Sequence, residues 1–218
     1  MSLPLTRLTG VTDRALAAMF DGQAEAYDED TFHPAVAAAL VDSLTGEPGT
    51  IVDVACGTGA AAFAVLRHAP RRVLAVDFSA AMIAKATAKA VALDPDGRIE
   101  FTVGSAVPLP VAAGGVDAVV CASALHFLGA AAVRDWLRVL RPGGQVAFSI
   151  SDAARFTPSP DFVALLGDLV IPDTEDKAAA LATDRGFGTA TARRFTVTAP
   201  DRTRSVFLVH ATAVGAAR

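Results

Sequence analysis

Two acidic residues and a glycine turn carry the strongest chemical signal in this sequence. Asp53 lies among apolar residues just before the turn CGTG at 56–59, and Asp77 ends a second apolar run. Gly57 and Gly59 lack a Cβ, so the backbone can turn sharply there and come close to a ligand. A buried carboxylate at Asp53 requires donors, either loop amides or the ammonium group of a ligand. At the end of a strand, Asp77 can accept hydrogen bonds from both hydroxyls of a ribose.

Alternating strands and helices are predicted to position these residues. Runs rich in β-branched residues predict strands, and alanine-rich stretches that end at Pro or Gly predict helices, one of them capped by Ser79. The predicted strands cover 50–55, 71–77, 98–104, 115–122 and 144–150, and the predicted helices cover 60–69, 80–93 and 130–140. Parallel strands need right-handed crossovers, so the pattern predicts a doubly wound α/β sheet that binds ligands at the carboxyl ends of its strands.

Both ends of the chain depart from this alternation. Two strand-like runs at 193–199 and 204–214 are separated by only four residues, which suits a hairpin. We therefore expect the last strand to enter the sheet antiparallel to the others. Residues 11–45 are predicted to form helices, with Pro34 in the first turn of one of them. We expect these helices to cover the ligand edge of the sheet.

Composition excludes several classes of protein. The 218 residues, 52% of them hydrophobic, suffice for one compact domain. A formal net charge of −4 lacks the basic excess that dominates nucleic-acid affinity, so no nucleic-acid partner is expected. No apolar run approaches the roughly 18 residues that span a bilayer, and the first residues carry no secretory signal. We therefore expect a cytoplasmic protein with no membrane partner, no metal, and Cys56 and Cys121 reduced.

The order of these motifs resembles that of the class I S-adenosylmethionine-dependent methyltransferases, specifically the small-molecule group often labelled type 11. The resemblance covers residues 24–150 and rests on the glycine turn, VLAVDFSAAMIAKA, GSAVPLPVAAGGVDAVVCASALHFL and RVLRPGGQVAFSI. It implies a single domain with a Rossmann-like seven-stranded sheet, mostly parallel, with helices on both faces and a C-terminal antiparallel hairpin strand. Within it, the resemblance implies a helical lid (1–45), a cofactor-binding core (50–150) and a short acceptor-side segment with the terminal hairpin (151–218).

The resemblance also implies residues for the methionine part of S-adenosylmethionine. Asp53 would face the ammonium group through loop amides or water, and Tyr27 would close over the cofactor from the amino-terminal helices. The remaining residues implied at the methionine part are Ala55, Cys56, Gly57 and Gly59 in the turn, and Cys121 and Ala122 at the end of the fourth strand. Ala55 stands where the family usually has its first glycine.

Further residues are implied for the nucleoside part. Asp77 would hold the ribose hydroxyls, while Phe78 and Met82 would pack on the adenine. The stretch implied to read the adenine edge consists of Ser105, Ala106 and Val107. Ser105 stands where the family commonly has an aspartate, and its hydroxyl can still accept a hydrogen bond from the adenine amino group.

The acceptor side offers several alternatives. His126, just after the fourth strand, is the best candidate for a general base, although a packing or cofactor-contact role is slightly favoured. His33 and Asp152 can also reach an acceptor, and helix-cap or surface roles compete for both. Candidates for an apolar acceptor wall are Phe20, Phe32, Phe127 and Phe156, each of which also suits an ordinary core. The basic group Arg193, Arg194, Arg202 and Arg204 is interpreted first as a solvated face and second as a contact for an anionic substrate.

The sequence thus predicts a methyltransferase that acts on an oxygen or nitrogen of a small metabolite and releases S-adenosylhomocysteine. The composition is typical of bacterial genomes in which such enzymes serve natural product biosynthesis. A first alternative is a methyltransferase fold recruited as a cyclase or another non-methylating catalyst. A nicotinamide-dependent oxidoreductase is a second, because residues 57–62 also fit a loose dinucleotide fingerprint. A non-catalytic partner subunit is a third, and a homodimer is left open.

Overall fold

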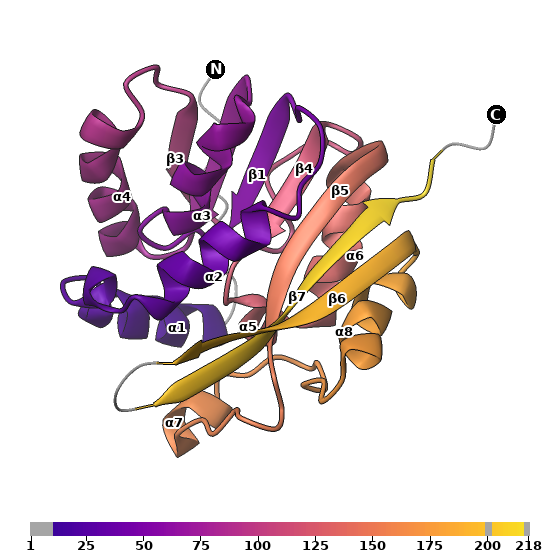
Figure 1. The fold of residues 1–218 in the computed structure, drawn as a ribbon. Helices are drawn as coiled ribbons and strands as arrows, with labels where there is room; N and C mark the ends of the chain where they lie inside the picture. Colours follow the sequence, from indigo (N-terminus) through magenta and orange to yellow (C-terminus); the bar gives the residue numbers. More distant parts are fainter. Residues whose placement is uncertain (1–10, 199–201, 216–218) are drawn as a thin grey trace.

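One seven-stranded sheet runs through the residues described by the computed structural model, 11–198 and 202–215 (Figure 1). Its strands are β1 (Thr50–Val54), β2 (Arg72–Asp77), β3 (Ile99–Val103), β4 (Val116–Cys121), β5 (Leu140–Ser151), β6 (Phe187–Thr198) and β7 (Thr203–Ala213). They lie in the order β3-β2-β1-β4-β5-β7-β6. Strands β1 to β5 pair in parallel, whereas β7 pairs antiparallel with both β5 and β6. The predicted fold class and the antiparallel hairpin strand are therefore confirmed.

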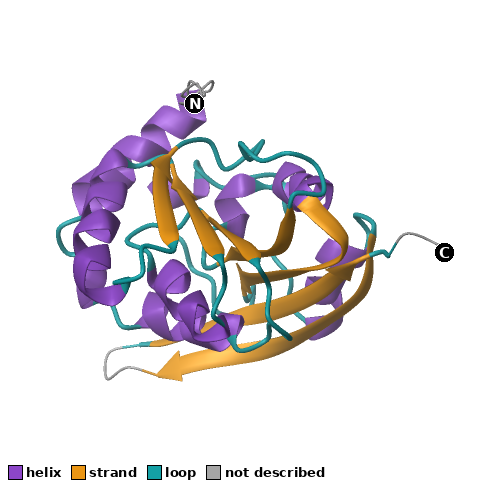
Figure 2. Ribbon diagram, turned by 90° about the horizontal axis from the view of Figure 1, so that it is seen from above, coloured by secondary structure: helices purple, strands orange, loops and turns teal. Residues whose placement is uncertain are grey.

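Helices cover both faces of this sheet, as predicted (Figure 2). They are α1 (Val11–Gln23), α2 (Phe32–Val41), α3 (Ala60–Ala64), α4 (Ala80–Leu93), α5 (Leu125–Leu128), α6 (Ala130–Val139), α7 (Pro160–Val163) and α8 (Glu175–Thr183), with 3₁₀ turns η1 (Tyr27–Glu29) and η2 (Val65–His68). Helices α2, α3 and α4 pack on one face around residues such as Leu40 and Ile83. Helices α6 and α8 pack on the other around Trp136 and Leu181. No helix within residues 11–198 or 202–215 has the length and apolar character to cross a membrane.

Two local features near the carboxyl ends of β1 and β2 follow from the residue types. Ser79 caps α4, since its Oγ accepts a hydrogen bond from the Met82 amide at 3.1 Å, as its position predicted. Gly59 adopts φ +90°, and a Cβ there would lie 2.8 Å from the ring of Phe63 and 3.2 Å from that of Phe101. Only glycine fits this turn, because both the backbone conformation and the packing exclude a side chain.

Three predicted boundaries differ from the structure. The helix predicted over 60–69 is α-helical only to Ala64 and continues as the 3₁₀ turn η2. Strand β5 begins at Leu140, so it includes residues predicted as a turn, and a register shift between Val116 and Ala118 accommodates them. Strand β6 begins at Phe187 rather than at 193, because pairing with β7 extends to Ala213 and stabilises a stretch whose residues do not signal a strand.

The amino-terminal helical segment is tied to the carboxyl edge of the sheet by hydrogen bonds. The Ser79 hydroxyl donates to Asp21 of α1 at 2.5 Å. Asp28 of η1 accepts hydrogen bonds from Thr58 Oγ1 at 2.5 Å and from Lys89 Nζ at 3.0 Å. The segment therefore lies where a lid was predicted. Residues 1–10 of the predicted lid lie outside the described residues, and the lid function stays a prediction.

Candidate functional site

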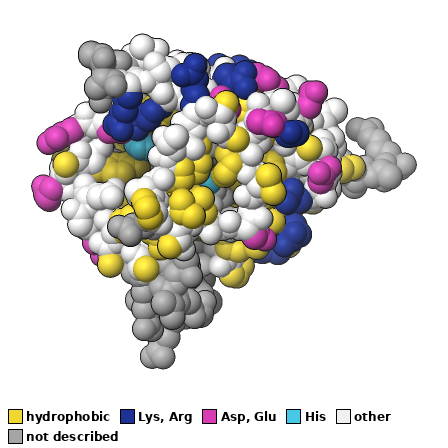
Figure 3. Space-filling view, turned by 90° about the horizontal axis from the view of Figure 1, so that it is seen from below, with side chains coloured by type: hydrophobic (Ala, Val, Ile, Leu, Met, Phe, Trp, Pro, Cys, Tyr) yellow, Lys and Arg dark blue, Asp and Glu magenta, His cyan; other side chains and the backbone are white. Residues whose placement is uncertain are grey.

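A cavity of about 480 Å³ lies at the carboxyl ends of the central strands (Figure 3). The turn after β1, the end of β2 and the loop after β4 form one part of its wall. The amino-terminal helices, the loop that leads from β5 to α7, and the start of β7 form the rest. A smaller pocket of about 30 Å³ shares Tyr27, His33, Ala55, Gly57 and Ala122 with it and reaches Asp53. The ligand edge predicted from the sequence is therefore hollow.

Asp77 joins the end of β2 to the turn after β1. Its Oδ2 accepts a hydrogen bond from the Gly57 amide and its Oδ1 one from the Ser79 amide, both at 2.8 Å. Burial raises the pKa of Asp77, and the surrounding backbone N–H groups oppose that shift. The side chain still lines the cavity, and each carboxylate oxygen has a second lone pair for a hydroxyl donor. Phe78 and Met82 line the cavity beside it.

Asp53 is the least satisfied polar side chain of the site. It is 1% exposed, and neither carboxylate oxygen has a hydrogen-bond partner among the described residues. Burial raises the pKa of Asp53 to about 8, the Ala62 amide opposes this shift, and the nearby charge of Asp77 adds a smaller increase. The influence of the Ala62 amide does not offset the cost of burying this carboxylate, and an ammonium group of a ligand in the smaller pocket would supply a further donor.

The turn residues divide into those that line the cavity and those that support it. Gly57 lines both pockets at φ +53°, and a Cβ there would lie 3.7 Å from the ring of Tyr27. Ala55 lines both pockets as well, and Cys56 lines only the smaller one. Gly59 lines neither, because its role is the close packing against Phe63 described above.

Four other residues implied for the cofactor also lie outside the walls of these two pockets, namely Ser105, Ala106, Val107 and Cys121. The Ser105 hydroxyl donates to the Val107 carbonyl at 2.7 Å and accepts from the Val107 amide at 3.1 Å. Ala106 and Cys121 belong to the hydrophobic core. The Ser105 loop closes on itself, so the implied reading of the adenine edge stays a prediction.

Aromatic side chains from the amino-terminal helices close the cavity from the lid side. Tyr27 stacks on His33, with ring centroids 5.5 Å apart and an interplanar angle of 11°. Burial, with Asp77 and other nearby acids, raises the pKa of Tyr27 to about 12, so its hydroxyl stays protonated. Phe20 contacts both Phe78 and Phe127, at centroid distances of 6.1 and 5.7 Å. These rings connect the predicted nucleoside end of the cavity to its acceptor end.

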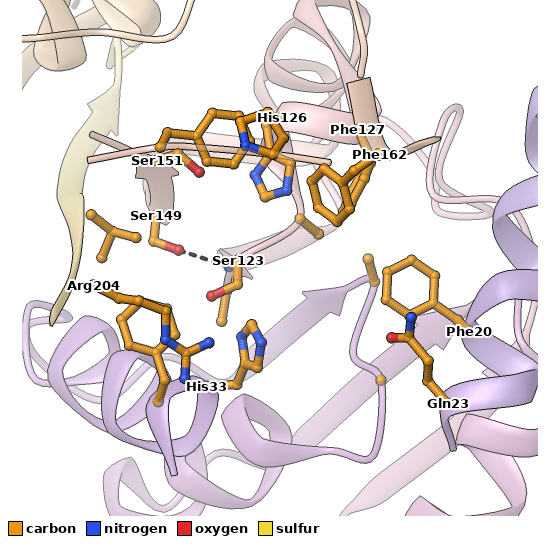
Figure 4. A pocket seen from close by; sticks show the side chains of 18 of the residues that line it. Phe20, Gln23, His33, Ser123, His126, Phe127, Ser149, Ser151, Phe162 and Arg204 are labelled. Atoms are coloured by element: carbon orange, nitrogen blue, oxygen red, sulfur yellow. Dashed lines mark hydrogen bonds between the residues drawn. The ribbon is translucent and has the colours of Figure 1, made fainter. Parts of the chain in front are cut away.

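His126 lies among phenylalanine rings in the part of the cavity wall where the acceptor is predicted to bind, which we call the acceptor end; it is lined by His126, Phe127, Phe156 and Phe162 (Figure 4). It is 7% exposed, and its ring centroid lies 4.3 Å from that of Phe127, 5.7 Å from Phe156 and 5.8 Å from Phe162. Its Nδ1 is buried without a hydrogen-bond partner among the described residues. Burial, with a smaller effect of His33, lowers the pKa of His126 to about 4. The ring is therefore neutral near pH 7.

The structure separates the other acceptor-side candidates. His33 lines the cavity, with its Nε2 3.8 Å from Asp30 Oδ2. Asp152 does not, because Arg194 holds its carboxylate at 2.9 Å and the Ala154 amide donates to it at 3.1 Å. The four predicted aromatic residues Phe20, Phe32, Phe127 and Phe156 all line the cavity.

The four arginines interpreted as a solvated face divide into two pairs. Arg202 and Arg204 line the cavity. Arg193 and Arg194 point elsewhere, the first donating to the Ala39 carbonyl at 3.1 Å and the second pairing with buried Asp152. Arg193, Arg194 and Arg202 are exposed, as the solvated-face interpretation predicts, although Arg194 also pairs with Asp152. Arg204 is only partly exposed and lines the cavity. Hairpin sequence alone does not show which strand face meets the lid.

Sequence reasoning missed several lining residues, namely Ser123, Ser149, Ser151, Ser205, Arg155 and Phe162. Ser149 Oγ accepts a hydrogen bond from the Ser123 amide at 2.7 Å, which ties the ends of β4 and β5 together (Figure 4). The alternation of Ser149 and Ser151 along β5 was the available signal, because residues two apart share one face of a strand. Arg155 and Phe162 lie in a loop and a short helix without a motif. No group of three or more potential metal ligands occurs among the described residues.

Comparisons with known proteins agree with this geometry. Residues 51–144 match a family described as a methyltransferase domain. The chain is similar to an arsenite methyltransferase of Halobacterium salinarum, with 33% identity over 150 residues, which cover 64% of this chain and 38% of that protein. It is also similar to a ubiquinone/menaquinone biosynthesis C-methyltransferase of Cereibacter sphaeroides, with 31% identity over 112 residues, 50% of this chain and 45% of that protein. The chain thus spans less than half the length of these two relatives.

Solved structures show the same fold. The 1,6-didemethyltoxoflavin-N1-methyltransferase of Burkholderia thailandensis, solved with 1,6-didemethyltoxoflavin and S-adenosylhomocysteine, superposes with a TM-score of 0.68. The match covers 97% of this chain and 94% of that chain at 18% identity. It therefore establishes the architecture of the sheet and its helices. In this sheet the antiparallel strand β7 lies between β5 and β6. A dinucleotide-binding sheet has the strand order 3-2-1-4-5-6 with no such inserted strand, so the sheet order disfavours the oxidoreductase alternative.

Proposed function

We propose that this chain is a class I S-adenosylmethionine-dependent methyltransferase that transfers a methyl group from S-adenosylmethionine to an oxygen or nitrogen of a small metabolite. The match of residues 51–144 to a methyltransferase domain supports this proposal. S-adenosylhomocysteine is the expected second product. We propose a small-molecule acceptor as its partner. The proposed location is the cytoplasm, and the proposed pathway is natural product biosynthesis. These finer points rest on the cavity and on the sequence.

The observation that carries the proposal is the pairing of two carboxylates at one end of the cavity. Asp77 lines it where a ribose would lie, already held by the amides of Gly57 and Ser79. Asp53 lines the adjoining pocket with both oxygens unpartnered. An S-adenosylmethionine molecule carries both complements, a ribose diol and an ammonium group. The residues present therefore fit this donor.

In such a transfer the residues of this chain exclude water, hold the acceptor in position and form a hydrogen bond with it. When bound, S-adenosylmethionine supplies an electrophilic methyl group that needs no further activation. Phenylalanine side chains exclude water and orient the acceptor, and positioning of this kind supplies a large part of the acceleration in group transfer. His126 lines the same cavity, its buried Nδ1 has no hydrogen-bond partner among the described residues, and its ring is neutral, so the ring can accept a hydrogen bond from an acceptor hydroxyl or amine. With a pKa near 4 it is a weak base, so we assign it orientation rather than proton removal. The acceptor gains the methyl group as the methyl–sulfur bond breaks, and the proton of the acceptor passes to water after the attack.

Isothermal titration of the protein with S-adenosylmethionine and with S-adenosylhomocysteine tests the donor site. We expect both to bind. If neither compound binds at millimolar concentration, the proposal is wrong. A screen of metabolite fractions with an isotopically labelled methyl donor, followed by mass spectrometry, then identifies the acceptor. Acceptor turnover without stoichiometric release of S-adenosylhomocysteine would support the non-methylating alternative instead.

A further inference from the structure

We propose that the acceptor carries an oxyanion, a carboxylate or a phosphate, that is bound by Arg155 and Arg204 at the acceptor end of the cavity. This inference rests on the proposed function, since it concerns the second substrate of the same site. The first argument is the distribution of charge. The chain has a formal net charge of −4, yet the charged side chains that line the cavity are Asp77 and three arginines, Arg155, Arg202 and Arg204.

Asp77, the carboxylate that lines the cavity, has a different task from these arginines. Asp77 accepts hydrogen bonds from the amides of Gly57 and Ser79 at the predicted nucleoside end. The arginines come from other segments of the wall, namely the loop after β5 and the stretch that leads into and starts β7. Basic side chains border the hollow in which a histidine is visible (Figure 3). Positive charge that borders an apolar hollow attracts and concentrates an anionic ligand.

Arg204 is held in place before any acceptor arrives. Its Nη2 donates to Asp30 Oδ1, and its guanidinium lies 4.0 Å from the centroid of the Phe32 ring. Although burial raises the pKa of Asp30, the hydrogen bond from Arg204 and the amide of Phe32 lower it to about 2, so the carboxylate stays ionised. A guanidinium carries five N–H donors in a planar fork, so one contact to Asp30 leaves other edges of the fork to face the cavity.

Arg155 lines the same cavity as Arg204 but lies in the loop after β5, whereas Arg204 lies in β7. It lines the cavity, its side chain is exposed, and within the described ranges no carboxylate pairs with it. Arg155 directly precedes Phe156 in the chain, and both residues line the cavity, so this exposed arginine lies at the cavity wall. The two arginines thus approach one space from different segments of the chain. An oxyanion between them would receive charge-assisted hydrogen bonds from both.

Unpartnered polar atoms show that the ligand at this end is polar in part. Ser123 adopts φ +62°, and its Oγ is buried without a hydrogen-bond partner in the part of the chain described. Among the residues that line this cavity, His33 Nδ1 and His126 Nδ1 are also buried without a hydrogen-bond partner in the part of the chain described (Figure 4). Each such group costs free energy unless a ligand satisfies it. With phenylalanine rings between them, these atoms suit a molecule with an apolar body and polar substituents.

Two probes of equal size test the charge preference directly. Benzoate and benzamide share a ring that suits the phenylalanine wall and differ in charge. Titrated into protein saturated with S-adenosylhomocysteine, benzoate should bind about tenfold more tightly than benzamide, the difference typical of one charged hydrogen-bonded contact. Phenyl phosphate, titrated in parallel, distinguishes a phosphate site from a carboxylate site. Equal affinity of the charged and neutral probes, or no binding of any probe at millimolar concentration, would overturn the proposal.

Arginine variants locate the preference. Arg155→Gln should reduce the ratio of benzoate to benzamide affinity several-fold, and Arg204→Gln should abolish it. Arg72→Gln is the matched control, because Arg72 pairs with Glu100 on the exposed side of β2 and does not line the cavity. If Arg204→Gln fails to fold, Arg155→Gln alone decides. An unchanged ratio in folded Arg155→Gln contradicts the assignment.

The same titrations separate this inference from the function beneath it. Protein that binds S-adenosylhomocysteine but treats benzoate and benzamide alike keeps the proposed methyltransferase function and loses the anionic acceptor. If neither S-adenosylmethionine nor S-adenosylhomocysteine binds, the probes are titrated into the protein alone, and a preference for benzoate there keeps the anion site and loses the proposed function. The two failures are therefore distinguishable in one set of measurements.

Discussion

The Asp77 carboxylate accepts a hydrogen bond from the Gly57 amide at 2.8 Å, which fixes the turn after β1 against the end of β2. One acidic side chain thus has two tasks. It holds the glycine turn in position, and it lines the cavity, where we propose that it binds the hydroxyls of a ribose. Substitution of this residue should therefore affect the ligand and the turn together.

Asp77→Ala should weaken the binding of S-adenosylhomocysteine by about tenfold to a hundredfold, because hydrogen bonds to a charged group contribute roughly 1.5–3 kcal/mol. Isothermal titration measures the affinity, and circular dichroism confirms that the variant is folded. Asp42→Ala is the control, since Asp42 is an exposed carboxylate paired with Arg67 and lies outside the cavity. Unchanged affinity in folded Asp77→Ala would show that the ribose is held elsewhere.

Gly57→Val should abolish cofactor binding. A β-branched residue is strained at φ +53°, and its side chain would extend into the space between the turn and the Tyr27 ring. Gly46→Val separates the two effects, because Gly46 has φ +70° but nothing lies within 4 Å of its Cβ position. Both variants should lose thermal stability, and only Gly57→Val should lose binding. Normal binding by Gly57→Val would remove the ligand from this turn.

His126→Gln should lower kcat by less than about tenfold, with the remaining activity flat between pH 6 and 8, because general-base catalysis typically contributes 10²–10⁴-fold and a base of pKa near 4 contributes little. The assay uses the acceptor that the labelled-methyl screen identifies. His68→Gln serves as the control, since His68 Nε2 lies 3.1 Å from the Val41 carbonyl outside the cavity. A loss of a hundredfold or more, relieved when the acceptor is supplied deprotonated, would establish His126 as the base.

The contribution of Asp53 to the stability of the ligand-free protein should fall as pH rises from about 4 to about 8. Burial raises the pKa of Asp53 from 3.8 to about 8, so the folded state binds a proton that the unfolded state has already released within that range. The stabilisation is fully present below pH 3.8 and is lost through pH 8. Asp53→Asn should therefore raise the melting temperature by a few degrees at pH 8 and change it little at pH 4, while weakening cofactor binding.

Asp117→Asn provides the opposite sign in the same measurement. The hydrogen bonds from Arg141 and the Thr50 amide lower the pKa of Asp117 against the effect of burial. Its contribution is present above the unfolded pKa of 3.8 and disappears as pH falls through the lower folded value. Asp117→Asn should thus lower the melting temperature at pH 8.

The outcome that would contradict the raised pKa of Asp53 is also defined by these measurements. It is a difference in melting temperature between Asp53→Asn and the wild type that stays the same at every pH.

The sequence predicted the parts of the fold that depend on local signals. Turn residues, the Ser79 cap and alternating strand and helix patterns placed all five parallel strands, since each pattern arises from neighbours in the chain. The extent of β6 and the early start of β5 were not predicted, because pairing with a distant strand determines both. The same limit applied to the site. Asp53, Gly57 and Asp77 follow strands and were found, whereas Arg155 and Ser123 become neighbours only through the tertiary fold.

The order of strands also constrains how the chain is made. Strand β7 follows β6 in the chain yet lies between β5 and β6 in the sheet. During synthesis β6 leaves the ribosome first and has no neighbour to pair with until β7 follows it. Arg204, which lines the acceptor end, belongs to that same late strand. A nascent chain would therefore complete its donor pocket well before its acceptor pocket, and premature termination before β7 would detach two strands from the sheet instead of one.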